Sequence, residues 1–250
     1  MPAPVVPGAE PMSVAGSSQG VLVLHGFTGS PFSMRPVAEA AVAAGFTVEM
    51  PLLPGHGTDV ADMVPTRFSD YVAAVESAYG DLASRCDRVV AAGLSMGGTL
   101  ACHLGIAHPE IAGLVLVNPM VEPLADSFVE MMRSTLEGGM ETIPGIGNDI
   151  ALEGITERSY PETPLAAALS LFAAVADQAP HLGEISCPVL LYSSVHDHVV
   201  PPSNGDFLAS TLSGPLERIM LDRSFHVATL DYDGPDIARG AVQFAAKVCG

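Results

Sequence analysis

Basic residues are scarce in this chain, and their scarcity argues against a whole class of partners. Lys and Arg together number 10, against 28 Asp and Glu, and Lys247 is the only lysine among the 250 residues. The formal net charge of −18 repels the phosphate groups of nucleic acids and of anionic membrane surfaces. We therefore expect no nucleic-acid partner, and we interpret the acidic excess as a solvated surface.

Cysteines and membrane signals are also few. Residues 1–7 carry no positive charge and no long apolar segment, so we expect no signal peptide. No window holds about 18 uninterrupted apolar residues, which argues against a membrane-spanning helix. The cysteines lie far apart without a C-x-x-C pair, as is typical of reduced thiols in a cytoplasmic protein. There are four, at Cys86, Cys102, Cys187 and Cys249.

Apolar residues are plentiful: 48% of the chain is hydrophobic and only 15% is charged, which excludes a disordered chain. The length suits one large α/β domain. Short β-branched runs alternate with alanine-rich stretches of helical periodicity, a pattern that predicts a mostly parallel sheet flanked by helices on both faces. The predicted strands are 21–25, 46–50, 88–94, 112–118, 188–193 and 216–221, and the main predicted helices are 34–44, 68–85, 96–107 and 235–248.

The alternation stops at Pro119. From there to about Leu182 the sequence indicates helical segments and a glycine-rich loop, without a convincing strand. This inserted segment begins where a strand ends, at the sheet edge where open α/β sheets bind ligands. We therefore predict an α/β core over residues 1–118 and 183–250, and a small helical cap over residues 119–182.

Residues 93–97 read G-x-S-x-G around Ser95. The pentapeptide follows an apolar run and opens a helix-forming stretch, which is the strand–turn–helix setting that a nucleophilic serine requires. Gly93 and Gly97 lack the side chains that would keep strand and helix apart. The helix N-terminus would then face negative charge that develops beside Ser95.

A serine hydroxyl is a weak nucleophile unless a histidine, itself oriented by a carboxylate, takes its proton. With this type of turn, the acid should follow a later strand and the histidine should come near the C-terminus. Asp197 follows the predicted strand that ends at residue 193, and His226 follows the one that ends at residue 221. Ser95, Asp197 and His226 are therefore the predicted catalytic triad.

Other residues compete for these roles. Asp222 and Asp231 could replace Asp197, but Asp222 lies too close to His226 in the chain and Asp231 suits a capping role better. His196 and His198 flank Asp197 as metal ligands would, yet no further cluster of His, Cys or Glu accompanies them. We therefore predict no metal and no cofactor.

An acyl-transfer site also needs hydrogen-bond donors for the oxyanion. One is the backbone N–H of Met96, the residue after the nucleophile, and the second comes from the loop after the first long strand. That loop begins His25-Gly-Phe27-Thr-Gly29. We predict that Phe27 donates its N–H while its ring lines the pocket.

The assembled motifs resemble the α/β-hydrolase superfamily, and within it the small bacterial monoacylglycerol lipases and their carboxylesterase relatives. The resemblance covers nearly the whole chain and implies the α/β-hydrolase fold, the same triad and the same oxyanion donors. Its blocks are 8–11, 25–29, 33–36, 55–58, 93–100, 197–202 and 226–233.

The resemblance also implies roles for two residues of the inserted segment. In such lipases an acidic residue of the cap contacts the glycerol hydroxyls, and a branched apolar residue narrows the pocket. Glu157 and Ile146 fall at the matching positions. The sequence departs most from the family pattern between Glu122 and Glu141, and we therefore predict no particular acyl-chain length for the substrate.

The function predicted from motifs and resemblance is a serine hydrolase that cleaves monoacylglycerols to fatty acid and glycerol through an acyl-enzyme on Ser95. Its partner is a small-molecule ester, with transient contact with lipid aggregates at most and no stable membrane anchor. A carboxylesterase for other short- to medium-chain esters is the alternative. A non-catalytic ligand-binding relative is a third reading, which the complete triad disfavours.

Overall fold

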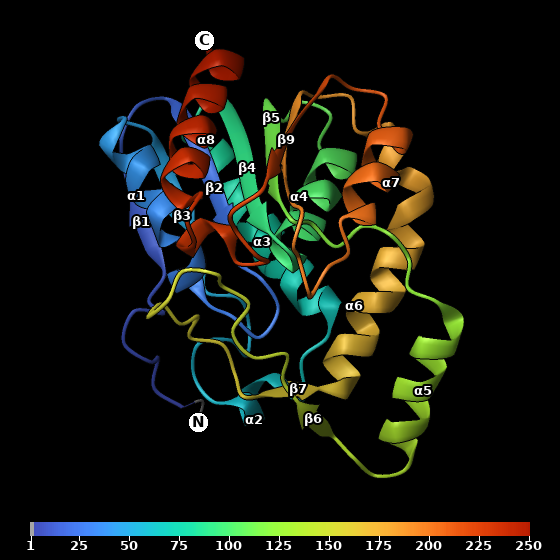
Figure 1. Cartoon of the computed structure of the whole chain (residues 1–250). Coiled ribbons are helices and arrows are strands. Elements are labelled where there is room, and N and C mark those ends of the chain that lie inside the picture. The colour runs from blue at the N-terminus through green and yellow to red at the C-terminus, as the bar shows by residue number, and fades with distance from the viewer. Residues whose placement is uncertain (1–2) are drawn as a thin grey trace.

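A central sheet of seven strands organises the chain (Figure 1). The computed structural model describes residues 3–250. The strands follow the order β1-β3-β2-β4-β5-β8-β9, with β1 antiparallel to β3 and the other neighbours parallel. The predicted mostly parallel sheet is confirmed. Its strands are β1 (Met12–Val14), β2 (Gln19–Leu24), β3 (Thr47–Met50), β4 (Arg88–Leu94), β5 (Gly113–Val117), β8 (Val189–Ser194) and β9 (Leu216–Leu221).

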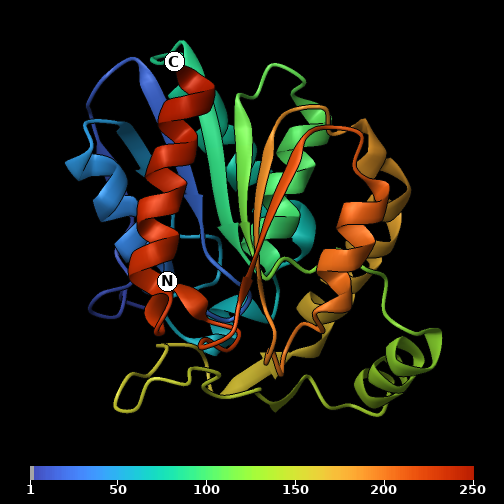
Figure 2. The same ribbon diagram turned by 45° about the horizontal axis from the view of Figure 1, so that its top comes forward.

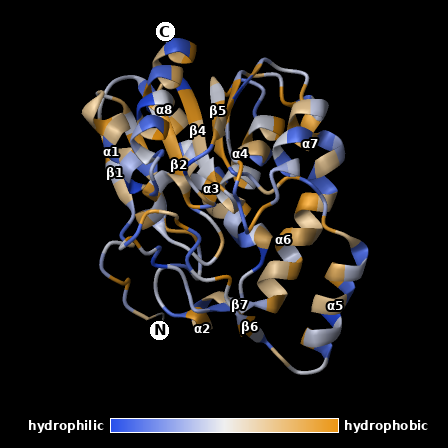
Figure 3. Ribbon diagram, in the orientation of Figure 1, coloured by the Kyte–Doolittle hydropathy of each residue, from blue (hydrophilic) through white to orange (hydrophobic). Residues whose placement is uncertain are grey.

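Helices cover both faces of this sheet (Figures 1 and 2). On one face α1 (Arg35–Ala43) and α8 (Gly234–Cys249) pack together over one apolar cluster. On the other face α3 (Phe68–Ala83) and α4 (Met96–Ala107) bury a second cluster. Because both faces are covered, the central strands are apolar along their length, as Figure 3 shows. The shorter helices are η1 (Pro31–Met34), α2 (Val60–Met63), α7 (Ser203–Thr211) and η3 (Ala228–Leu230).

The inserted segment contains helices, as expected, and also two strands that the sequence did not predict. Strand β6 (Thr142–Pro144) pairs antiparallel with β7 (Glu162–Pro164) in a separate two-stranded sheet. The expectation of no strand between residues 119 and 182 was therefore wrong. Each strand has three residues and ends at a proline, too short a run for alternation to appear. The helices of the segment are α5 (Asp126–Glu137), which stands out from the body in Figure 2, α6 (Leu165–Gln178) and η2 (Ala179–Glu184).

Among residues 3–250, one helical stretch is long and apolar enough, by length and composition alone, to cross a membrane. Helices α6 and η2 together span Leu165–Glu184, 20 residues with a mean hydropathy of 1.2. The side chains of Leu171 and Val175 are buried in the same cluster as strands β4 and β5, so this is a core helix of the fold. The expectation of no signal peptide rests on residues 1–7, and two of these, Met1 and Pro2, lie outside the described residues.

The turn between β4 and α4 is the closest backbone approach that positions the site. A Cβ on Gly93 would overlap the carbonyl oxygen of Gly97, and a Cβ on Gly97 would overlap the carbonyl oxygen of Leu24. All of these obstacles are backbone atoms, which cannot rotate away. The two glycines are therefore required by packing against α4 and β2 as well as by the turn itself.

This packing predicts a sharp contrast between two glycine substitutions. We expect Gly97→Ala to lower the free energy of unfolding by about 3 kcal/mol or more, because a backbone clash cannot relax. Gly80→Ala is the matched control, since Gly80 is an exposed residue of α3 whose added Cβ would meet nothing within 4 Å. It should stabilise by about 0.5–1 kcal/mol, because alanine favours the helix. Thermal unfolding of both variants checks this, and an unchanged Tm for Gly97→Ala would contradict it.

Candidate active site

Ser95 occupies the strained turn at the end of β4, with φ of 55° and ψ of −119°. Among the residues described, only two others that are not glycine have a positive φ, Thr28 and Asn118. Thr28 follows β2 and Asn118 follows β5, so the three strained positions lie beyond three neighbouring strands. Such strain is typical of functional sites, and this edge is where open α/β sheets bind ligands.

His226 and Asp197 form a buried pair beyond β9 and β8. Nδ1 of His226 lies 2.8 Å from Oδ2 of Asp197, and the two side chains are only 7% and 1% exposed. The other carboxylate oxygen accepts the N–H groups of Val199 and Val200, each at 2.8 Å. Because a carboxylate can only accept a hydrogen bond, we assign the ring proton of His226 to Nδ1, which leaves Nε2 as the nitrogen that can accept a proton.

The competing acids have other surroundings. Asp231 is buried, and its carboxylate accepts the backbone N–H groups of Ala151, Leu152 and Phe225 at 2.7–2.9 Å. Asp222 is exposed. Asp197 is thus the carboxylate that contacts the ring of His226, in agreement with the predicted pairing.

The loop after β2 passes directly beside the candidate nucleophile. A Cβ built on Gly26 would lie 3.4 Å from Cβ of Ser95, and Phe27 lines the same cavity as Ser95 and His226. Met96 is the first residue of α4, so its N–H has no acceptor within the helix. These positions suit the two predicted oxyanion donors.

A pair of buried histidines supports this loop. Nδ1 of His25 lies 2.9 Å from the carbonyl oxygen of Gly26, and its Nε2 accepts the N–H of Leu53 at 3.2 Å. The ring of His56 packs edge-on against that of His25, with centroids 5.1 Å apart. Burial lowers the pKa of His25 to about 3 and that of His56 to about 4. Both are therefore neutral structural groups at pH 7.

Ser95 and His226 open into a cavity of about 370 Å³ between the sheet edge and the inserted segment. Aliphatic, aromatic and methionine side chains of both parts dominate its lining, which suits an acyl chain. Phe128 of α5 lies against Phe172 of α6, with ring centroids 6.1 Å apart. The sequence did not predict these pocket residues, because apolar side chains recur at the same helical spacing whether they pack in the core or line a pocket. Lining residues from the insertion include Leu124, Phe128, Met131, Met132, Leu171 and Phe172.

Glu157 and Ile146 both line this cavity. Glu157 is half-buried, and a Cβ built on Gly29 would lie 2.8 Å from its Oε1, so its carboxyl faces the loop that follows β2. Burial raises the pKa of Glu157 to about 7, although nearby His226 acts in the opposite direction. Ile146 is 70% exposed and lies at the outer part of the lining.

Tyr160 explains the Gly55-His-Gly-Thr58 motif, to which sequence reasoning assigned no role. Its hydroxyl donates to the carbonyl oxygen of Gly55 at 2.8 Å and accepts the N–H of Thr58 at 2.9 Å. Its own N–H donates to the carbonyl oxygen of Thr28 at 3.0 Å. Tyr160 therefore ties the segment that carries Glu157 to the core.

The histidines next to Asp197 do not form a metal centre with it. His196 and His198 are exposed, and the ring of His198 lies against Asp149 at 2.8 Å. Within residues 3–250 no group of three or more His, Cys, Asp or Glu side chains is arranged to hold a metal ion.

Comparisons with known proteins give one consistent answer. The chain is 43% identical to the thermostable monoacylglycerol lipase of Bacillus sp. (strain H-257), over 99% of this chain and 98% of that one. It is 25% identical to the carboxylesterase of Bacillus subtilis (strain 168), over 96% and 97% of the two chains.

Solved structures agree. A structure from work on the metagenome-derived lipolytic enzymes LipS and LipT superposes with a TM-score of 0.93 at 40% identity, covering 98% of this chain and 100% of that one. The monoacylglycerol lipase of Paleococcus ferrophilus shares the fold, with a TM-score of 0.76 at 18% identity over 96% and 99% of the chains. The model of the alpha/beta hydrolase family matches residues 21–237. The chain belongs to the alpha/beta hydrolase family.

Proposed function

We propose that this protein is a monoacylglycerol lipase in which Ser95, Asp197 and His226 form the catalytic triad. The observation that carries the proposal is the buried His226–Asp197 pair, 2.8 Å apart, whose histidine opens with Ser95 into one apolar cavity. The likeness over the full chain to a monoacylglycerol lipase supports the substrate class. Residues 119–182 serve in this proposal as the cap over the cavity.

In the proposed reaction Oγ of Ser95 attacks the ester carbonyl carbon while Nε2 of His226 takes the hydroxyl proton. The N–H groups of Phe27 and Met96 donate to the oxyanion. His226 then gives its proton to the departing glycerol oxygen, which leaves an acyl-enzyme on Ser95. Water, deprotonated by His226, then attacks the acyl carbon, and His226 returns the proton to Oγ of Ser95 as the acyl–oxygen bond breaks, which frees the fatty acid.

Glu157 is the proposed contact for glycerol. Its carboxyl lies beside Gly29, three residues along the chain from Gly26, which borders Ser95. A carboxylate accepts hydrogen bonds from two hydroxyls at once, which suits the diol of a 1-monoacylglycerol. Ile146, on the outer part of the lining, would narrow the entrance for the ester.

A carboxylesterase for other short- to medium-chain esters is the second candidate, favoured by the mainly apolar lining and by the B. subtilis relative. The two candidates differ in what they require of the alcohol. Measuring kcat/KM for monoacylglycerols against methyl esters of the same acids separates them, with di- and triacylglycerols alongside. Equal values for both alcohols would favour the carboxylesterase.

The compartment is a further part of the proposal. We place the enzyme in the cytoplasm, because all four cysteines are free thiols and two of them, Cys102 and Cys187, are buried. Contact with lipid aggregates would be transient and serve substrate uptake.

Replacing the nucleophile should remove activity while leaving the fold intact. We expect Ser95→Ala to lower kcat by about a millionfold, as loss of a triad serine does. Circular dichroism and thermal unfolding provide the control for folding. Retention of more than about a tenth of the activity by pure protein would place the nucleophile elsewhere.

The triad should also fail as a unit. We expect Asp197→Asn and His226→Ala each to be severely impaired, and neither loss to add to that of Ser95→Ala. Asp231→Asn is the matched control, because Asp231 is a buried carboxylate bonded to backbone N–H groups and not to the ring of His226. It should lower Tm, and its loss of kcat should be far smaller than that of Asp197→Asn. The opposite pattern for these two acids would show that Asp197 was the wrong choice.

Glu157 should give the enzyme a pH-dependent preference for glycerol esters. Its raised pKa of about 7 means that the carboxyl is protonated below that pH and ionised above it. We expect the ratio of kcat/KM for a monoacylglycerol to that for the methyl ester to rise as pH increases through about 7. The catalytic steps that both esters share cancel in this ratio.

The variants Glu157→Gln and Glu157→Ala test this preference. The ratio should lose its pH dependence in both, and Glu157→Ala should lower kcat/KM for monoacylglycerols by about ten- to a hundredfold, since a hydrogen bond lost in a buried site costs about 1–3 kcal/mol. An equal fall on both esters would indicate a general structural role. No fall on either would leave Glu157 as a surface charge.

A further inference from the structure

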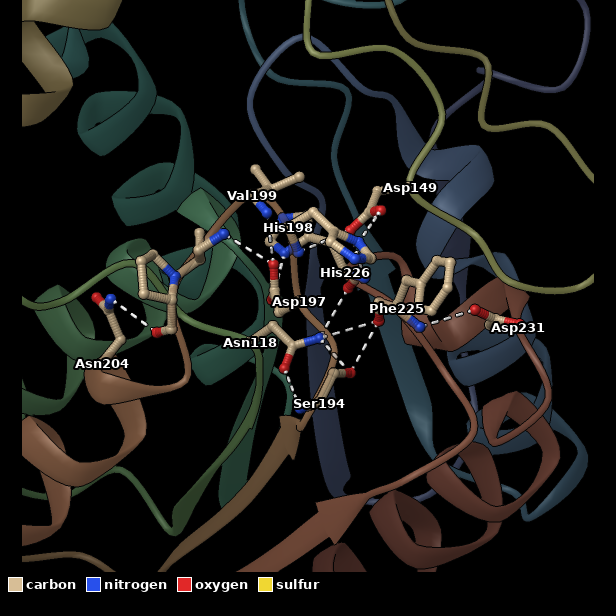
Figure 4. A network of polar contacts seen from close by, with 12 residues as sticks. Asn118, Asp149, Ser194, Asp197, His198, Val199, Asn204, Phe225, His226 and Asp231 are labelled. Carbon is tan, nitrogen blue, oxygen red and sulfur yellow. Dashed lines mark hydrogen bonds and ion pairs between the residues drawn. The ribbon is translucent and has the colours of Figure 1, made fainter.

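One acidic residue of the inserted segment touches the candidate catalytic histidine. Asp149 is 9% exposed, and its Oδ2 accepts the backbone N–H of His226 at 3.0 Å and that of His198 at 3.2 Å. Its Oδ1 lies 2.8 Å from Nδ1 of His198, and its carbonyl oxygen accepts the N–H of Val227 at 3.1 Å. Figure 4 shows Asp149 beside His198 and His226.

His226 is thereby held at three points. Asp197 holds Nδ1 of the ring, Nδ2 of Asn118 donates to the carbonyl oxygen of His226 at 2.8 Å, and Asp149 accepts its backbone N–H. Asn118 and Asp197 follow strands of the sheet, whereas Asp149 belongs to the insertion. The orientation of the histidine therefore depends directly on where this part of the insertion lies.

The same part of the insertion carries the proposed glycerol contact. The side chain of Asn148, next to Asp149, accepts the N–H of Glu157 at 2.8 Å and donates to the carbonyl oxygen of Ile155 at 3.1 Å. Ala151 lies three residues after Asn148, and its N–H donates to the carboxylate of Asp231. The same carboxylate accepts a hydrogen bond from the N–H of Phe225. Residues 148–157 thus form a loop closed on itself by Asn148 and attached to the His226 segment by Asp149 and Asp231.

We propose that Asp149 is a positioning residue that aligns His226 and couples its position to that of Glu157. Without the carboxylate, the buried N–H of His226 has no acceptor, and the loop loses its bonds to His198. Both consequences displace groups that must lie within a fraction of an ångström of their working positions. The coupling to Glu157 rests on the proposed function, in which His226 is the base and Glu157 binds glycerol.

Asp149→Ala and Asp149→Asn are the test variants, and Asp233→Asn is the matched control. Asp233 is equally buried and binds Ser224 and Arg223 just before His226, but it has no bond to His226 or to the insertion. Steady-state kinetics on a monoacylglycerol and on the methyl ester of the same acid are measured for each, together with Tm and the acylation burst on a nitrophenyl ester.

We expect Asp149→Ala to lower kcat and the burst rate on every ester by about ten- to a hundredfold. The ratio of kcat/KM for monoacylglycerol to methyl ester should fall by a further factor of about three to ten. Asp149→Asn should rescue part of both losses, because its amide oxygen still accepts the N–H of His226. In the double variant with Asp149→Ala and Glu157→Gln, the fold loss in this ratio should be smaller than the product of the two single losses.

Asp233→Asn should lower Tm without changing the ratio. The inference is overturned if the Asp149 variants likewise lose stability only. It is also overturned if the fold loss in the ratio for the double variant with Glu157→Gln equals the product of the two single losses. If Asp149→Ala does not fold, the same comparison holds with Asp149→Asn. Failure of the proposed function would look different, because Ser95→Ala or His226→Ala would then retain activity.

Discussion

The close approach of three backbone segments at Ser95 is the constraint on which the site depends. Gly97 packs against the carbonyl of Leu24, and Gly93 packs against Gly97, so β2, β4 and α4 meet without intervening side chains. The loop after β2 can then border Ser95, which brings Gly26 beside Ser95 and Phe27 into the lining of the same cavity. Because the neighbouring strands are parallel, their carboxyl ends deliver Asp197 and His226 to the same edge.

Much of this frame could be predicted from the sequence, since a parallel strand buried on both faces is a continuous apolar run. The runs that became β4 and β9 agree with the structure at both ends, and the turn residues between β4 and α4 have a recognisable chemistry. Strand β1 was missed because it is a three-residue edge strand without a buried residue. Strands β6 and β7 were missed because each is short and ends at proline.

The parts of the site that escaped prediction are long-range polar contacts. The bond from His226 to Asp149 joins residues 77 apart in the chain, and the one to Asn118 spans 108 residues. No local period or spacing encodes such a pair, and an acidic residue in an acidic chain is most simply read as a solvated charge. Asp149 is instead buried, and a buried carboxylate must accept hydrogen bonds from nearby donors. Here those donors include the backbone N–H of the histidine.

Electrostatics link the two ends of the proposed substrate site. Burial raises the pKa of Glu157 to about 7 and nearby His226 counteracts the rise. In the proposed reaction His226 becomes a cation when it takes the proton of Ser95, and its field would then favour the ionised form of Glu157 more strongly. The carboxylate would therefore bind the glycerol hydroxyls most tightly while the ester bond is breaking. An interaction that strengthens in the transition state raises kcat, whereas one of constant strength lowers only KM. If the proposed roles hold, an acid with a raised pKa placed within the field of the histidine would make recognition of glycerol part of the catalysis.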